Sequence, residues 1–220
     1  MTELEKCMAG EWYDCHDKVF LEFKNKTHRL LMKYNSLPYD HKEEKRQVLK
    51  EMLGSVGTKV SIGHSFICDY GRNIHIGNNV TVNTGCTFVD CNRITIGNNV
   101  LISCGAKVLG PITIGNNSKV GAGAIVLKDV PDNCTVVGNP GRIVKKQHPQ
   151  PAGEVDLDQV NLPDPMLDRM EALVKRLTVL ESCLARHARR LGCEGCDAAP
   201  EDAPCHGQCT DKSEPADTAQ

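Results

Sequence analysis

An apolar residue recurs every six positions over a long part of this chain, and this period constrains the fold more than any other feature. The letters IGNN begin at Ile76, at Ile96 and again at Ile114. Steps of six from Ile76, with one slip of two residues around Cys91–Arg93, reach only apolar residues: Ile76, Val82, Phe88, Ile96, Ile102, Val108, Ile114, Val120 and Val126. A period of about six fits neither an amphipathic helix nor a simple strand.

A parallel β-helix explains this period. Three hexapeptides complete one triangular coil of about 18 residues, and each hexapeptide points one apolar side chain into the interior. The Gly, Asn, Asp, Ser and Thr residues between the apolar positions suit tight corners. An earlier coil from about Val60 gives about four coils within residues 59–146, ending near Pro131 and Pro140 because proline cannot continue a strand ladder. The alternative is an ordinary β protein whose Gly- and Asn-rich loops match by chance.

Residues 1–58 lack the six-residue period and are predicted to form a helical cap. Apolar residues recur at helical spacing between Val19 and Tyr34. Asp40 with Glu43 resembles a capping box that begins a second helix, which stops by Gly54. We expect these helices to cover the open end of the β-helix.

The C-terminal part is predicted to contain a linker, a coiled-coil helix and a disordered tail. Residues 147–164 are rich in proline and acidic residues, and residues 192–220 are poor in apolar ones. Between them, at 165–191, apolar residues alternate in steps of four and three, with His187 as the single polar member: Met166, Met170, Leu173, Leu177, Leu180, Leu184, His187 and Leu191. This seam predicts a parallel coiled coil of copies of the chain. Docking of the helix back onto the β-helix is the alternative.

The cysteine-rich tail offers candidate zinc ligands. Cys193, Cys196, Cys205 and Cys209, with His206, have the spacing of a zinc site. Because no strand or helix pattern surrounds them, a disordered tail with free thiols is the preferred interpretation.

Composition excludes several classes of protein. The net charge of −2 gives no support for nucleic-acid binding, and no apolar run approaches the roughly 20 residues that span a bilayer. The N-terminus has no apolar segment typical of a secretion signal. The twelve cysteines are therefore expected to be free thiols in a reducing cytoplasm.

Longer motifs resemble the hexapeptide-repeat O-acetyltransferases. MAGEWYD, LGSVG, CDYGRNIHIGNNV and ITIGNNVLI in the N-terminal half are similar to the maltose and galactoside O-acetyltransferases. From Cys104 onward, CGAKVLGPITIGNNSKVGAGAIVLKDVPDNCTVVGNPGRIV and DLDQVNLPDP resemble the serine O-acetyltransferases more closely. The resemblance implies a mainly β fold, a left-handed parallel β-helix, assembled as a homotrimer. It also implies transfer of acetyl from acetyl-CoA to the hydroxyl of a small-molecule acceptor.

The resemblance also implies site residues. Tyr13, Asp14, Asn83 and Asp90 match positions near the acceptor, although Asn83 and Asp90 are equally explained as turn residues. An acid of the galactoside enzymes is replaced by Cys15. The positions implied for CoA are Cys104, Ala122, Gly123, Leu127 and Lys128, with Arg142 and Lys145 near the phosphates, where fixed positive charge favours binding. The alternative for the basic residues is that they are simply solvated.

The catalytic base that the resemblance implies is missing. In the sugar enzymes a histidine follows the segment that matches IGNNVLI, and it takes the proton of the attacking hydroxyl. Here Ser103 runs directly into Cys104, so a stretch on the order of two coils is absent. His64 is the one candidate replacement, since His75 is expected to be structural. Cys91 or Cys104 as a nucleophile would need a neighbouring base that lowers the thiol pKa.

Three functions follow from these observations. The first is an acetyl-CoA-dependent O-acetyltransferase acting on a sugar, or on serine, at a low rate. The second is a trimer that binds CoA without turnover. The third is a structural protein in which the β-helix presents the coiled coil and the cysteine tail.

Overall fold

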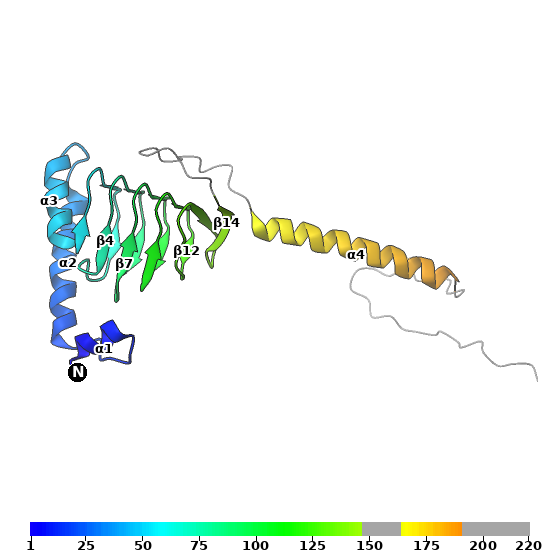
Figure 1. Cartoon of the computed structure of the whole chain (residues 1–220), viewed down its shortest axis with the longest axis horizontal. Helices are drawn as coiled ribbons and strands as arrows, with labels where there is room; N and C mark the ends of the chain where they lie inside the picture. The colour runs from blue at the N-terminus through cyan, green and yellow to red at the C-terminus, as the bar shows by residue number, and fades with distance from the viewer. Residues whose placement is uncertain (147–163, 191–220) are drawn as a thin grey trace, which may run out of the picture. The chain divides into compact units, whose positions relative to one another are not determined.

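Short parallel strands form three sheets that lie along one axis, and the chain visits the sheets in turn (Figure 1). The structure is a computed structural model that describes residues 1–146 and 164–190. It divides into one unit that ends at Asp164 and another that begins at Pro165, so each is treated by itself.

The three sheets are the faces of a triangular β-helix. Face A contains β1 (Ser55–Val56), β4 (Ile74–Ile76), β7 (Ile94–Ile96) and β10 (Ile112–Ile114). Face B contains β2 (Ser61–Ile62), β5 (Thr81–Val82), β8 (Leu101–Ile102), β11 (Lys119–Val120), β13 (Cys134–Val137) and β14 (Arg142–Lys146). Face C contains β3 (Ile67–Cys68), β6 (Thr87–Val89), β9 (Lys107–Leu109) and β12 (Ile125–Val126). Only β14 pairs antiparallel, with β13, among these strands of the described residues.

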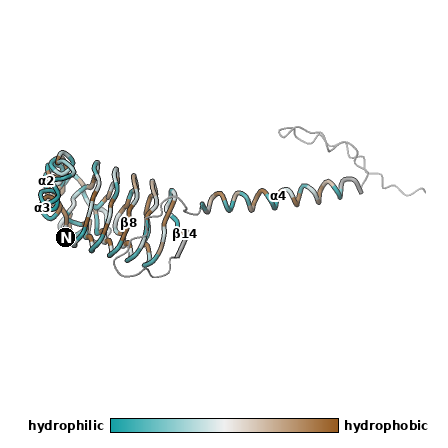
Figure 2. The backbone as a smooth tube through the Cα atoms, turned by 90° about the horizontal axis from the view of Figure 1, so that it is seen from above, coloured by the Kyte–Doolittle hydropathy of each residue, from teal (hydrophilic) through white to brown (hydrophobic). Residues whose placement is uncertain are grey.

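The register of the strands confirms the repeat. Ile96 pairs with Ile76 on one side and with Ile114 on the other. All nine predicted interior positions are at most 3% exposed. Hydrophobic positions accordingly recur from coil to coil (Figure 2). Burial of one such Ile or Val side chain stabilises the fold by roughly 1.5–3 kcal/mol.

The slip of two residues lies at one corner, as predicted. The connection between β6 and β7 covers residues 90–93, whereas that between β9 and β10 covers only 110–111. The ladder begins before Val60, because Ser55 of β1 already pairs with His75. Val56 lies opposite Ile76 in this register, one coil earlier.

A column of asparagines lines the corner between faces A and B. Asn79, Asn99, Asn117 and Asn133 all have a left-handed backbone, with φ between 54° and 58°. Asparagine tolerates this conformation better than other side chains with a Cβ. Each side-chain amide donates to the next asparagine, at 2.9, 2.9 and 3.0 Å. The column therefore joins four successive coils.

Three helices precede the β-helix: α1 (Glu3–Ala9), α2 (Lys18–Ser36) and α3 (Lys42–Met52). Helices α2 and α3 pack on each other at the end of the β-helix where the first coil lies (Figures 1 and 2). The hydroxyl of Tyr34 donates to the carbonyl of Ile62 at 2.6 Å, and buried Leu30, Leu31 and Leu49 join the interior cluster of the coils. This confirms that helices cover the first coil.

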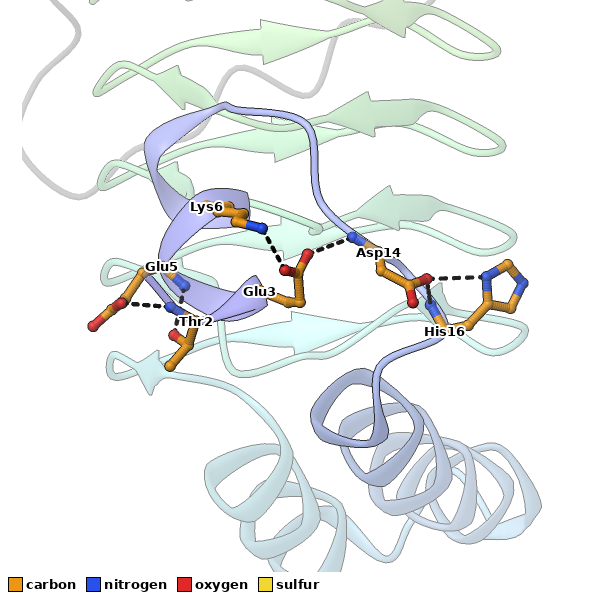
Figure 3. Close-up of polar contacts among 6 residues, drawn as sticks. All are labelled: Thr2, Glu3, Glu5, Lys6, Asp14 and His16. Atoms are coloured by element: carbon orange, nitrogen blue, oxygen red, sulfur yellow. Dashed lines mark hydrogen bonds and ion pairs between the residues drawn. The ribbon is translucent and has the colours of Figure 1, made fainter.

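The expected capping box at Asp40 is wrong. The residue before α3 is His41, and its side chain makes no capping hydrogen bond. His41 instead contacts the Glu44 carboxylate at 3.0 Å. A capping box does begin α1, where Thr2 and Glu5 bond reciprocally (Figure 3).

The second unit contains α4 (Pro165–Arg190). Five residues of the predicted seam lie on this helix more than half exposed: Met170, Leu173, Leu177, Leu180 and Leu184. Residues 147–163 of the proposed linker, Leu191, and the tail with its four cysteines lie outside the described residues. Among the helices of the described ranges, none is long and apolar enough to cross a bilayer.

Candidate active site

A ladder of backbone hydrogen bonds joins successive coils at the corner between faces B and C. The amide of Gly123 donates to the carbonyl of Cys104 at 2.9 Å, and the amide of Gly105 donates to that of Thr84 at 3.0 Å. The amide of Gly85 likewise donates to the carbonyl of His64 at 3.0 Å. The structure therefore brings the predicted residues Cys104, Ala122 and Gly123 together with His64 along one edge.

This corner has room for a ligand. Gly105 and Gly123 have φ values of 68° and 67°, and an added Cβ at either would meet no atom within 4 Å. Cys104, Ala122 and Gly123 are exposed. An extended ligand can therefore approach the backbone at this corner.

The other predicted CoA residues lie around this edge. Leu127 and Lys128 follow β12 at the far end of face C, and both are exposed. The amide of Gly141 donates to the carbonyl of Ile125 at 2.7 Å, which places the exposed Arg142 beside the end of the same face. Lys145 lies in the same strand and pairs with Thr135.

Tyr13 belongs to a cluster at the opposite corner, between faces C and A. Its ring lies 5.0 Å from that of Phe20, which stacks on Tyr70 at 5.7 Å. Burial, followed by a hydrogen bond with Cys7, raises the pKa of Tyr13 well above its ordinary value. Tyr13 is therefore neutral and half-buried.

Asp14 lies next to an exposed group that the sequence analysis missed. Its carboxylate accepts from the His16 amide at 2.9 Å and lies 3.3 Å from the ring Nδ1 (Figure 3). The hydrogen bond from the His16 amide lowers the pKa of Asp14. The Cys15 sulfur lies 3.6 Å from the same Nδ1. The sequence did carry a signal for this group, because Asp14, Cys15 and His16 are three consecutive residues of types that bind metals.

Asp90 is fully buried at the same corner as Tyr13. Its Oδ1 accepts from the amides of Asp69 and Tyr70, both at 2.9 Å, and its Oδ2 has no partner within the described chain. Burial raises the pKa of Asp90 to about 6. These contacts explain Asp90 as a turn residue without any ligand.

Asn83 lies at the other corner, with His64 and Cys104. It follows β5, whereas Asp90 follows β6, so face C separates the two. Its Oδ1 accepts from the amide of Thr84 at 2.8 Å. Within one chain the predicted acceptor residues therefore do not meet.

Neither histidine of the coils has a partner typical of a catalytic base. The ring of His64 lies 6.5 Å from that of Tyr39, and no carboxylate contacts it in the described ranges. His75 lies 3.0 Å from the Ser55 hydroxyl, and burial lowers its pKa. Burial raises the pKa of the Cys91 thiol, which opposes a role as nucleophile.

Family models match two parts of this chain. The maltose acetyltransferase hexapeptide capping motif matches residues 6–57, and the bacterial transferase hexapeptide (six repeats) matches residues 93–128. The protein YJL218W of Saccharomyces cerevisiae, provisionally named an acetyltransferase, is 30% identical over 66% of this chain and 93% of its own length. The serine acetyltransferase of Bacillus subtilis is 40% identical, over 62% of this chain and 65% of its own length.

Solved structures agree with these matches. A maltose O-acetyltransferase from Clostridium difficile 630 has a TM-score of 0.59 at 30% identity, covering 68% of this chain and 99% of that one. A galactoside acetyltransferase in complex with coenzyme A has a TM-score of 0.59 at 27% identity, covering 67% and 92%.

The yeast match also measures what this chain lacks. It extends over 183 aligned positions but uses only 66% of the 220 residues, or about 145. The relative therefore has about 38 positions without a counterpart here, close to two coils of about 18 residues. The length agrees with the segment that the sequence analysis found absent after Ser103.

Proposed function

The chain belongs to the hexapeptide-repeat acetyltransferase family, and we propose that it transfers acetyl from acetyl-CoA to a hydroxyl of a sugar. The observation that carries this proposal is the open ladder of Cys104, Ala122 and Gly123. The amides of this ladder are already paired between coils, so we expect its carbonyl oxygens, each able to accept a second hydrogen bond, to receive the amides of the pantetheine arm. Arg142 and Lys145 are proposed to hold the phosphates.

We propose that the active site forms between copies of the chain, as a homotrimer. The CoA ladder and Asn83 share one corner, whereas Tyr13 and the adjacent Asp14 lie toward another. Two copies placed corner to corner would bring these sets together, which a single copy does not. This junction joins two different surfaces of the chain. Such a contact can repeat around a closed ring, whereas a two-fold dimer pairs identical surfaces.

The proposed rate is low. The acceptor hydroxyl must lose its proton as its oxygen attacks the thioester carbon, and the thiolate of CoA then leaves. A positioned base contributes about 10²–10⁴-fold to such a step. The segment in which the sugar enzymes carry their histidine is absent, so we expect turnover to be lower by about that factor.

Two alternatives to a sugar acetyltransferase predict different results in an activity assay. The 40% identity to a serine acetyltransferase favours serine as the acceptor. The missing segment favours a trimer that binds CoA but does not turn over. We also propose a cytoplasmic location, in which the thiols of exposed cysteines such as Cys15 and Cys104 would stay reduced.

The test is transfer of labelled acetyl from acetyl-CoA to maltose, a galactoside and L-serine, with the products separated by chromatography. A thiol reagent is unsuitable as the readout, because Cys15, Cys104 and Cys183 are exposed and react as well. Slow labelling of a sugar supports the proposal, whereas labelling of serine alone replaces it. Labelling of no acceptor despite calorimetric CoA binding supports the non-catalytic trimer.

Calorimetry of CoA binding needs a matched pair of variants. Ala122→Trp fills the proposed corner, whereas Thr113→Trp adds the same ring to an exposed position of face A. We expect Ala122→Trp to abolish CoA binding and Thr113→Trp to retain it. Equal affinities for both would contradict the assignment of this corner.

A further inference from the structure

A pocket lies away from the ladder, between α3 and the first coil. It has a volume of about 380 Å³, within the range of small-molecule sites. Its walls come from one side of α3, the end of α2 and the strands β1 and β2. The residues are Tyr34, Tyr39, Lys42, Glu43, Lys45, Arg46, Leu49, Val56, Gly57, Lys59, Val60, Ser61 and Ile62.

The charge of this pocket is strongly positive. Lys42, Lys45, Arg46 and Lys59 line it, and Glu43 is the single acid of the lining. The whole chain carries a net charge of −2, so this excess is local. A concave surface with one sign of charge concentrates ligands of the opposite charge.

Lys45 is the one buried cation among the residues that line the pocket. It is only 8% exposed, and its Nζ lies 5.0 Å from the centre of the Tyr34 ring and 6.0 Å from that of Tyr39. No hydrogen-bond acceptor or carboxylate contacts its ammonium group within the described residues. A buried charge is normally paired or fully hydrogen-bonded, because desolvation is costly. An anion in the pocket would supply the missing partner.

Lys59 departs from the pattern of the other coils. It occupies the corner where later coils carry Asn79, Asn99, Asn117 and Asn133, and it has a left-handed backbone with φ of 53°. Lysine has no side-chain amide to continue the asparagine column and tolerates this conformation less well. The first coil therefore gives up its corner asparagine and places a cation at the pocket instead.

We propose that this pocket binds a phosphate-bearing small molecule, with Lys45 as the buried contact. A phosphomonoester carries close to two negative charges and several acceptor oxygens, which matches a group of four cations better than a single carboxylate does. The exposed ring of Tyr39 offers a surface for the organic part. This site is separate from the CoA ladder and does not depend on acetyl transfer.

The test is a calorimetric titration of the full-length protein with four separate ligands: inorganic phosphate, glucose 6-phosphate, glucose and citrate. We expect both phosphates to bind and glucose to be silent. Stronger binding of citrate than of either phosphate would overturn the assignment of the ligand class. Displacement of the bound phosphate by CoA would overturn the location, because the probe would then report the ladder.

Three variants locate the binding. Lys45→Met keeps the unbranched stem of the side chain without its charged end, and should weaken phosphate binding by about tenfold or more. Lys59→Asn restores the residue of the other coils and should also weaken binding while the fold is retained. Lys24→Met, which removes an exposed lysine of α2 outside the pocket, should leave binding unchanged.

The outcome that overturns the proposal is specific. If the wild-type protein binds no phosphate at millimolar concentration, the pocket is not an anion site. If Lys45→Met and Lys59→Asn bind phosphate as well as Lys24→Met does, binding occurs elsewhere. If Lys45→Met changes the oligomeric state in sedimentation while phosphate does not bind, a carboxylate of a second copy is the partner of Lys45.

Discussion

The Asp90 carboxylate accepts a hydrogen bond from the backbone amide of Tyr70 at 2.9 Å, and this bond joins the corners of two successive coils. The same oxygen accepts from the amide of Asp69, while the other oxygen is buried without a partner in the described chain. Asp90 is thus a buried acid at the edge of the cluster that contains Tyr13. Its protonation is coupled to the stability of the corner.

We predict that Asp90 makes the protein less stable as the pH rises from about 4 to about 6. Burial raises its pKa to about 6 in the folded state, above the ordinary 3.8. Between these values the folded state binds more protons than the unfolded state, so unfolding becomes easier as the pH increases. The loss, of order 1–3 kcal/mol, is complete above the folded pKa.

Urea unfolding of the wild type and of Asp90→Asn, measured at several pH values, isolates this contribution. The variant cannot titrate at position 90, so its stability should fall less over the same interval. Other groups titrate equally in both proteins and cancel in the difference. Parallel curves for the two proteins would show that Asp90 does not bind a proton in this range.

We predict that Ile96→Ala costs about 2–5 kcal/mol of the free energy of unfolding. Ile96 is 1% exposed and lies between Ile76 and Ile114, so truncation opens a cavity that neighbouring coils cannot close without losing register. The neighbouring Thr95 faces outward, and Thr95→Ala should cost less than about 1 kcal/mol. Urea denaturation measures both values. Equal costs would contradict the inward and outward assignment of β7.

The repeat predicted the interior of the coils because one physical rule, burial of one apolar side chain in six, acts at every rung. The same rule cannot place residues that interact through helices. Lys45 contacts Tyr34 and lines the pocket only because α3 packs on the first coil, which depends on helix packing. Lys59, the second lysine discussed for this pocket, did carry a signal in the sequence, since GTKV stands where the next two coils read GNNV.

The candidate site was only partly predictable for a similar reason. Cys104, Ala122 and Gly123 share a corner because their spacing follows the coil length. Asn83 and Asp90 are seven positions apart in sequence, yet they lie at different corners of the coil, before and after strand β6 of face C. The period predicts where a residue lies around the coil, but it does not predict which polar residues are buried. The structural role of Asp90 is recognised only from the backbone amides that donate to its carboxylate.

We predict that His64→Asn changes acetyl transfer by less than about threefold, whichever acceptor is labelled. His64 shares the corner of the CoA ladder, but no acid orients its ring within the described residues, and a base that contributes to catalysis supplies about 10²-fold or more. His75→Asn is the matched control, since its ring contacts Ser55 on another face. A loss of about 10²-fold in His64→Asn alone would identify His64 as the base.

We predict that α4 is protected by self-association through its seam. Leu180 belongs to the seam and is 57% exposed, whereas its neighbour Val179 lies outside the seam and is 61% exposed. A glutamate in the seam places charges against one another in the coiled coil, whereas the adjacent position faces water. Leu180→Glu should therefore raise the rate of trypsin cleavage at Lys175 and Arg176 by about tenfold or more, and Val179→Glu should not.

The two variants place the same charge at adjacent positions, and the change in intrinsic helix propensity, a few tenths of a kcal/mol, is small beside the expected effect of the seam. For the wild type, the rate of cleavage should rise as the protein is diluted, because dilution dissociates the helices of the coiled coil. Sedimentation of the same samples reports whether the seam or the β-helix maintains the assembly. Rapid and equal cleavage of the wild type and of both variants would show that α4 has no partner strand. Slow cleavage of Leu180→Glu would show instead that the helix is protected through another surface, as docking onto the β-helix requires.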